Sequence, residues 1–278
     1  MKNSNVSIVI PVFNRAHLVS RAIDSALSQT IPCEVLLVDH GSTDDISAIA
    51  EKYQGRIRYI RRDSDNGPIA CWRDGAEQAT GEFLHFTYDD DWIEPDFIEK
   101  CLDQFNSDVA FVYTRATLHN LTDETKQLQL RHPIGLHPIA DIVHYLLLSR
   151  LTISPGCAMF RRLDVLQNLL LEVPGANGLY GKNSGVGEDV LLFLLTSLQY
   201  EYYAHIPKPL ANFLSHTGSI TIDAIQSGKS VELAKSYAHA KQYFTKQNNA
   251  VKVLTGFRKI LFKLNWVVRS YLPTGNWH

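Results

Sequence analysis

The stretch EFLHFTYDDDWIEPD, residues 82–96, runs from apolar and aromatic residues directly into three aspartates. Its first part, 82–88, has the composition of a buried strand. Asp89, Asp90 and Asp91 follow where that strand ends, the position at which α/β folds usually carry function. Two interpretations are open: the aspartates form either an exposed turn, in which water screens their repulsion, or one side of a cation site.

Apolar runs alternate with segments of helical spacing along the N-terminal half of the chain. This alternation predicts an α/β fold whose mostly parallel, Rossmann-like central sheet is flanked by helices. Asp39 and the three aspartates would then lie at the carboxyl ends of strands, the edge where such sheets bind ligands. The expected strands are 6–12, 33–40, 56–62 and 82–88, and the expected helices lie within 16–30, 41–53 and 66–81.

The composition is that of an ordinary globular protein. The 278 residues, 45% hydrophobic and 20% charged, suffice for one large core or two coupled ones. A net charge of -2 gives no general attraction for nucleic acid, so an anionic ligand needs a local site. The four cysteines show no C-x-x-C spacing, and the apolar run 6–13 is too short for a signal or membrane segment. We therefore expect a reduced, cytoplasmic protein, with residence at the inner face of the cytoplasmic membrane left open.

The sequence contains neither a G-x-x-x-x-G-K-[ST] loop nor a G-x-G-x-x-G loop, which argues against P-loop enzymes and dinucleotide oxidoreductases. A nucleotide diphosphate at the strand ends would need its charge neutralised in another way. Carboxylate oxygens suit Mg²⁺ or Mn²⁺. The acidic run therefore predicts a site built around a metal ion.

Four segments, VSIVIPVFNR, VDHGSTDD, NGP…CWRDG…ATGEFLHF and YDDDWIEPDF, resemble in order and spacing the N-terminal half of family 2 glycosyltransferases. Shorter matches recur at GEDVLLFLL and NFLSHTGSIT. The resemblance implies the GT-A fold. It also implies metal-dependent, inverting transfer of a sugar from a nucleotide-sugar donor.

The resemblance gives the acidic run a role. In the family this run, the DxD motif, binds the cation and the ribose of the donor, and the central metal-binding aspartate falls on Asp90. Tyr88 stands where a strict D-x-D has its first aspartate, so which neighbour completes the metal shell stays open. His216, in an H-x-x-S-I context, would approach the diphosphate or ligate the metal; the alternative is a solvated loop histidine. The implied metal ligands are Asp90, Asp91 and His216.

The donor is expected to be UDP-linked by family resemblance, but its base stays open. Asp39-His40 stands where the family usually has two aspartates, the second of which can bind the nucleobase, and a neutral imidazole can donate or accept. Asp39 could instead form an Asx-turn, His40 lie in a surface loop, and Arg73 pair with Asp39 or Asp74. The expected donor contacts are Pro11, Val12, Phe13, Asn14, Arg15, Asp39, His40, Gly67, Arg73, Asp89 and Asp90.

Two acids, Glu188 and Asp189, precede a strongly apolar helix in GEDVLLFLL. Acids at this position are ordinary helix caps, because the helix dipole favours ionised carboxylates there. The resemblance instead matches Asp189 to the general base of the family and leaves Glu188 as an orienting neighbour. The glycine-rich segment 175–187 before them is either a lid over the site or a surface connection.

We expect a GT-A catalytic domain at 1–221, with a donor half at 1–100 and an acceptor half at 101–221, followed by a helical extension at 222–278. Within the extension, 256–272 combines basic residues with apolar residues and a tryptophan. Such a helix could contact a membrane surface peripherally, or it could pack on the catalytic domain.

The expected function is sugar transfer to a glycan or lipid-linked glycan in bacterial surface polysaccharide synthesis, such as O-antigen, capsule or lipopolysaccharide. A catalytically silent nucleotide-sugar-binding protein is the alternative from another class. A sugar-nucleotidyltransferase is less favoured, because PVFNRAH lacks the glycine-rich, basic loop that such enzymes carry after the first strand.

Overall fold

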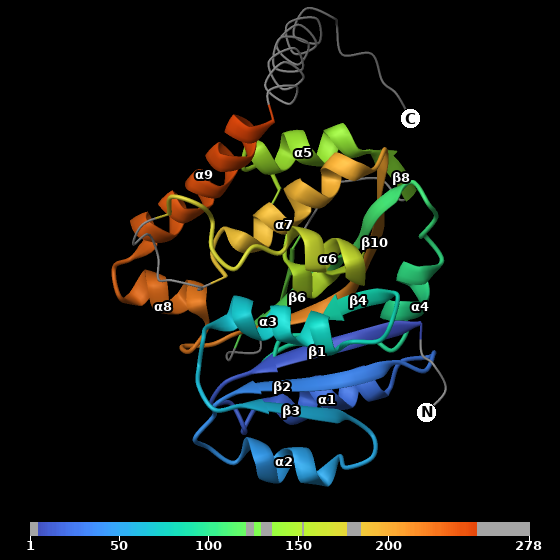
Figure 1. The fold of residues 1–278 in the computed structure, drawn as a ribbon, viewed down its shortest axis with the longest axis vertical. Helices are drawn as coiled ribbons and strands as arrows, with labels where there is room; N and C mark the ends of the chain where they lie inside the picture. Colours follow the sequence, from blue (N-terminus) through green and yellow to red (C-terminus); the bar gives the residue numbers. More distant parts are fainter. Residues whose placement is uncertain (1–4, 121–124, 129–134, 152, 177–184, 249–278) are drawn as a thin grey trace, which may run out of the picture.

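The computed structural model describes residues 5–120, 125–128, 135–151, 153–176 and 185–248. In this part of the chain one sheet of ten strands carries helices on both faces (Figure 1). The strand order is β3-β2-β1-β4-β9-β6-β10-β5, with β7 beside β6 and β8 beside β10. The strands are β1 Val6–Val12, β2 Glu34–His40, β3 Arg58–Arg62, β4 Phe83–Phe86, β5 Trp92–Ile93, β6 Val109–Asn120, β7 Thr125–Leu128, β8 Gly135–Pro138, β9 Ala158–Arg161 and β10 Tyr202–Ser215.

The four N-terminal strands are parallel, as the alternation of apolar runs and helices predicts. β1 pairs with both β2 and β4, and β2 pairs with β3. Every residue of β1 is buried, which explains its continuous apolar run. The other half of the sheet is mixed, because β9 runs antiparallel to both β4 and β6. The parallel half brings the ends of β1, β2 and β4 to one edge.

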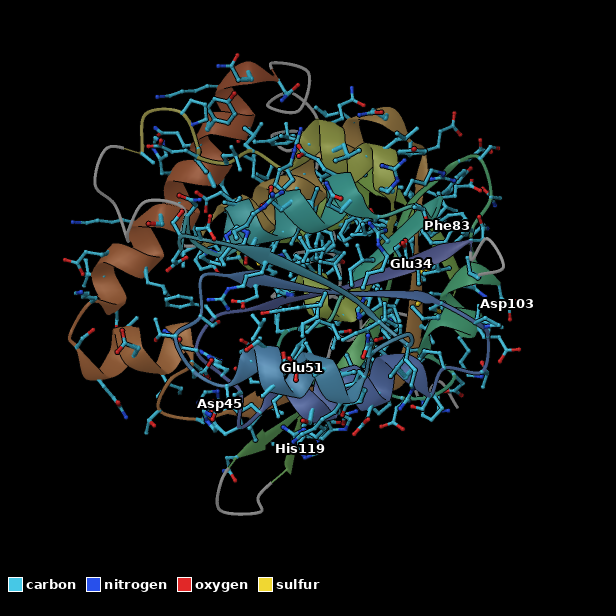
Figure 2. The ribbon with its side chains drawn as sticks, turned by 60° about the horizontal axis from the view of Figure 1, so that its bottom comes forward. Glu34, Asp45, Glu51, Phe83, Asp103 and His119 are labelled. Carbon is cyan, nitrogen blue, oxygen red and sulfur yellow. The ribbon has the colours of Figure 1, made fainter. Side chains whose placement is uncertain are left out.

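Helices cover both faces of the parallel half (Figure 2). α1 and α2 lie on one face, and α3 crosses β1 and β2 on the other. α1 begins at Val19 rather than at 16, because the residues that follow β1 form a turn held to the next loop. The helices are α1 Val19–Leu27, α2 Ile46–Lys52, α3 Pro68–Gln78, α4 Phe97–Leu102, α5 Ile139–Leu147, α6 Arg162–Asn168, α7 Glu188–Thr196, α8 Ile220–Gln226 and α9 Ser230–Gln247.

The described part of the expected C-terminal extension packs on the rest of the molecule. α9 lies against α7, and α8 leads into it along one flank (Figure 1). The predicted amphipathic segment 256–272 lies outside the described residues. None of the helices in the described ranges has both the length and the apolar character needed to cross a membrane.

The contact between α3 and β1 depends on Gly75. A Cβ added at this residue would overlap Cγ1 of Val9 and lie 3.3 Å from Cγ2 of Val38. The missing side chain therefore lets α3 approach the sheet closely, and this position of α3 places its N-terminus beside the strand ends.

We predict that Gly75→Ala lowers the free energy of unfolding by about 1–3 kcal/mol, because overpacking outweighs the gain in helix propensity. Urea denaturation measures this change. Gln78→Ala, at an exposed position of the same helix, should stay within about 0.5 kcal/mol of the parent. Equal stability of the Gly75→Ala and Gln78→Ala variants would contradict the close contact.

Candidate active site

A cavity of about 560 Å³ opens at the carboxyl ends of β1, β2 and β4. The strand ends contribute Val12, His40 and the acidic run to its lining. Asp189 at the start of α7 and Tyr237 of α9 line it as well. The cavity thus joins the parallel half of the sheet to residues far along the chain.

The acidic run after β4 is buried. Asp89 and Asp90 are each 9% exposed and Asp91 is 7% exposed, so these residues do not form a solvated turn. Oδ1 of Asp91 accepts a hydrogen bond from the Leu214 amide at 2.9 Å. Burial raises the pKa of Asp89 to about 7 against the opposing effect of Arg15, and burial and Asp90 together raise the pKa of Asp91 well above its usual value. Ionising all three carboxylates therefore requires positive charge beside them.

Arg15 supplies positive charge at this point. Its Nη1 lies 2.5 Å from Oδ2 of Asp90 and 3.4 Å from Oδ1 of Asp89. Its Nη2 donates to the Gly218 carbonyl at 2.5 Å. The guanidinium therefore joins the acidic run to the segment that follows β10.

The loop after β1 places Arg15 through its neighbour Asn14. Asn14 has a left-handed backbone with φ of 54°, and its Oδ1 accepts a hydrogen bond from the Thr43 amide at 2.8 Å. The Asn14 amide donates to Oγ of Ser42 at 3.0 Å. Asn14 therefore stabilises the conformation of the loop, and this conformation places the Arg15 guanidinium beside the aspartates.

His216 contacts Asp90 from the end of β10. Its Nε2 lies 2.8 Å from Oδ2 of Asp90, and its Nδ1 accepts a hydrogen bond from the Gly218 amide at 3.1 Å. A neutral ring that accepts at Nδ1 carries its proton on Nε2, so His216 donates to Asp90 here.

Carboxylate oxygens suit a divalent cation. Here, however, Nη1 of Arg15 lies within 3.4 Å of Asp89, Asp90 and His216. Within the described ranges, no group of three or more His, Cys, Asp and Glu residues is arranged to hold a metal ion. In the described residues, Arg15 therefore supplies the positive charge at the place where a cation would meet the acidic run.

Asp39 and His40 differ in their relation to the cavity. Asp39 is fully buried and does not line the cavity in the described part of the chain; its Oδ1 accepts from the Ser42 amide at 2.8 Å, and its Oδ2 accepts from Arg61 Nη1 at 2.8 Å. His40 lines the cavity, with Nε2 3.2 Å from Oδ2 of Asp74. Its buried Nδ1 has no hydrogen-bond partner among the described residues.

The segment around α3 contributes Gly67 but not Arg73. Gly67 lines the cavity and has a positive φ of 84° at the N-terminal end of α3. Arg73 is absent from the lining that the described residues form. Its guanidinium lies 2.8 Å from Glu77 and donates to the Leu166 carbonyl at 2.5 Å, so Arg73 joins α3 to α6.

The two acids in the first turn of α7, Asp189 and Glu188, differ in their position relative to the cavity. Oδ1 of Asp189 accepts from the amides of Gly187 at 3.0 Å and Val190 at 2.7 Å, and its Oδ2 accepts from the Tyr237 hydroxyl at 3.1 Å. Burial raises the pKa of Asp189 to about 6. Glu188 is 5% exposed and does not line the cavity in the described ranges, and burial raises its pKa to about 7.

A sequence model described as "Glycosyl transferase family 2" matches residues 7–167, more than half of the chain. The chain belongs to glycosyltransferase family 2. An uncharacterized glycosyltransferase of Rickettsia conorii is 33% identical over 135 residues, 48% of this chain and 22% of that protein. Chondroitin synthase of Escherichia coli is 33% identical over 123 residues (43% of this chain, 18% of that one), and hyaluronan synthase of Pasteurella multocida is 39% identical over 116 residues (39% and 12%). The chain thus spans less than a quarter of the length of these relatives.

Solved structures confirm the GT-A fold of this family 2 chain. Residues 1–349 of S. aureus TarS in complex with UDP-GlcNAc superpose with a TM-score of 0.63 at 18% identity, covering 87% of this chain and 71% of that one. The same TarS residues in complex with UDP give a TM-score of 0.61 at 17% identity, covering 87% and 70%. At this identity the likeness concerns the fold alone.

Three further side chains support the site, and two of them, Tyr237 and Arg21, carry no sequence signal. Tyr237 lies in a helix far beyond the matched region, and helical periodicity distinguishes core from surface only. Arg21 donates from Nη2 to the Asp90 carbonyl at 2.9 Å, which no spacing indicates. Tyr88 hydrogen-bonds Ser154 through their hydroxyls at 3.1 Å and stacks on Trp72, so it supports the cavity from the core.

The raised pKa of Asp189 predicts a change in stability with pH. Because folding raises this pKa from about 3.9 to about 6, the ionised carboxylate destabilises the folded state, and this effect grows as pH rises between those values. Asp189→Asn should therefore raise the Tm at pH 8 and change it little at pH 4.5. Thermal unfolding at both pH values measures the difference. Asp103→Asn, at an exposed position, should show no such pH dependence; a Tm lowered at pH 8 by Asp189→Asn would contradict the prediction.

Proposed function

We propose that this protein transfers a sugar from a nucleotide-sugar donor to a hydroxyl of a glycan or lipid-linked glycan. One observation carries the proposal: the buried acidic run and Asp189 line the same cavity, so a site for a diphosphate and a proton acceptor open to one space. The similarity to chondroitin and hyaluronan synthases supports a role in bacterial surface polysaccharide synthesis, such as O-antigen, capsule or lipopolysaccharide. The cytoplasmic location stays a prediction.

The donor half of the site consists of the end of β1, His40 and the acidic run. The TarS complexes with UDP-GlcNAc and UDP support a UDP-linked donor. His40 lines the part of the cavity where the base would lie. Pro11, Val12 and Phe13 add an apolar surface, and Phe13 is 41% exposed. Asp39 would contribute indirectly, by stabilising the turn after β2 through its hydrogen bonds with Ser42 and Arg61.

Mn²⁺ or Mg²⁺ would be held by Asp90 together with Asp89 or Asp91, and His216 would support Asp90. Such a cation would neutralise the diphosphate as it departs. Arg15 must leave Asp90 for a cation to approach, and the donor diphosphate offers its guanidinium a new anionic partner. Arg15 would thus contact the aspartates in the free protein and the diphosphate in the complex.

Asp189 would act as the general base of an inverting transfer. As the acceptor oxygen attacks the anomeric carbon, the Asp189 carboxylate takes the hydroxyl proton and the bond to the diphosphate breaks with its electron pair. A pKa of about 6 keeps the carboxylate ionised at neutral pH while making it a stronger base than an exposed aspartate. Glu188 lies away from the cavity, which favours Asp189 between the two acids.

A catalytically silent binding protein is the second candidate, because the donor half would bind nucleotide sugar without Asp189 taking part. Turnover of the donor distinguishes the two candidates, because only the transferase converts the nucleotide sugar to products. A sugar-nucleotidyltransferase gains no support from the loop after β1. In this loop Asn14 bonds to Thr43, and Arg15 pairs with the acidic run.

The first test concerns the cation. Asp90→Asn should abolish Mn²⁺-dependent binding of UDP, because it removes the central carboxylate. Arg15→Gln should bind Mn²⁺ more tightly than the parent in the absence of nucleotide, because the competing guanidinium is gone. Mn²⁺ binding by electron paramagnetic resonance and UDP binding by calorimetry measure both effects. Asp96→Asn, at an acid paired with Lys208 outside the cavity, is the matched control. UDP affinity unchanged by EDTA and by Asp90→Asn would refute the metal assignment.

The second test concerns the base. Asp189→Asn keeps the size of the side chain but cannot accept the proton, so sugar transfer should fall by about 10²-fold or more. Donor affinity should stay unchanged, because the acidic run holds the diphosphate elsewhere. Transfer is measured with a panel of nucleotide sugars and glycan acceptors. Glu188→Gln should cause a smaller loss; full activity of Asp189→Asn would remove Asp189 from the mechanism.

A further inference from the structure

A tyrosine of α9 contacts the proposed general base. The Tyr237 hydroxyl lies 3.1 Å from Oδ2 of Asp189, and both residues line the cavity. The family match ends at residue 167, whereas α9 spans Ser230–Gln247. Asp189 and α9 therefore both lie beyond the family match, and α9 completes the surroundings of Asp189.

The three hydrogen bonds to Asp189 fix the orientation of its carboxylate. Two amides of its own helix turn, those of Gly187 and Val190, donate to Oδ1. Tyr237 is the partner of Oδ2. Backbone amides thus bind Oδ1. Oδ2 accepts a hydrogen bond from Tyr237 and can accept a second one, for example from an acceptor hydroxyl.

The close approach of α9 to α7 depends on Gly187. This residue has φ of +106°, and a Cβ added to it would lie 3.1 Å from the Ser236 carbonyl oxygen and 3.3 Å from Cβ of Ala240. Small residues on both sides let the backbone of α9 reach the N-terminus of α7. That contact sets Tyr237, next to Ser236 in sequence, within hydrogen-bonding distance of Asp189.

The surroundings of Asp189 contain few charges. Glu188 lies beside it on α7, and Asp189 interacts electrostatically with Lys241 of α9 and with Tyr88 after β4. Lys241 donates to Oγ of Ser149 at 2.9 Å. The Asp189 carboxylate and burial raise the pKa of Tyr237 far above its usual value, so its hydroxyl keeps its proton and can only donate to Asp189.

We propose that Tyr237 is a positioning residue for sugar transfer: its hydroxyl holds Oδ2 of Asp189 in place to receive the proton of the acceptor hydroxyl. This inference rests on the proposed function of Asp189. In the step, the acceptor proton passes to Oδ2, the acceptor oxygen bonds to the anomeric carbon, and the diphosphate leaves with the electron pair of its bond. Tyr237 keeps its own proton throughout and favours the ionised carboxylate.

The test is Tyr237→Phe, which removes only the hydroxyl. Loss of one hydrogen bond to a carboxylate should raise the pKa of Asp189, so the acid limb of the kcat–pH profile for transfer should move about one unit to higher pH. The plateau kcat should fall about tenfold, and KM for the donor should stay constant. Tyr243→Phe, a partly buried tyrosine on the same helix, is the matched control and should leave the profile unchanged.

A second measurement does not depend on activity. The Asp189 carboxyl is followed by NMR in protein with ¹³C-labelled aspartate side chains, and Asp189→Asn identifies its signal. In Tyr237→Phe this signal should titrate about one pH unit higher than in the parent. An unchanged titration would overturn the inference whatever the rates show. A shifted titration with an unmoved acid limb would overturn the catalytic role of the pair, because Asp189 would then not be the base of the proposed function.

Discussion

Three adjacent carboxylates buried at the end of one strand are the constraint around which this site is arranged. Burial raises the pKa of Asp89 and of Asp91, and each carboxylate repels its neighbours, so the run needs partners of opposite charge and hydrogen-bond donors. These come from distant parts of the chain: Arg15 after β1, Arg21 in α1, and the Leu214 amide and His216 at the end of β10. The acidic run therefore draws together the first strand, the first helix and the last strand. A structure that moved one of them would leave buried negative charge without a partner.

Arg15 is the most important of these partners, because its guanidinium binds the same carboxylates that a divalent cation would bind. Arg15 gives Asp89 and Asp90 a cationic partner without any ligand. Under the proposed function, a donor that brought both a cation and a diphosphate would replace the ion pairs of Arg15 with Asp89 and Asp90 by two others, the cation with Asp90 and Arg15 with the diphosphate. The cation and the nucleotide are then expected to bind together rather than independently, since each relieves a cost that the other creates.

The sequence predicts the parallel half of the fold well, because buried parallel strands are continuous apolar runs and the helices between them have clear periodicity. It predicts the mixed half poorly: β9 has four residues and pairs antiparallel with both neighbours, which no local pattern indicates. The same division holds for the site. Asp90, Arg15 and Asp189 lie at the cavity as the motifs predict, whereas Arg73 is directed to the Leu166 carbonyl, because a long side chain follows tertiary partners that spacing does not reveal. Tyr237 is not predicted for the same reason, since its contact with Asp189 exists only through the packing of α9 on α7.

The acidic run and Asp189, which both line the cavity, differ in the kind of partner that each one has. The acidic run is surrounded by cationic groups, Arg15 and Arg21, and by a histidine, so its carboxylates are suited to hold positive charge. Asp189 accepts hydrogen bonds from two amides and a tyrosine, all neutral, and burial leaves its pKa at about 6. A cation bound to the run would lower the pKa of Asp89 and of Asp91, whereas Asp189 would stay able to exchange a proton near neutral pH. The separate roles proposed for the acidic run and for Asp189, holding charge and accepting a proton, thus follow from their partners, and α9 supplies the Tyr237 partner of Asp189.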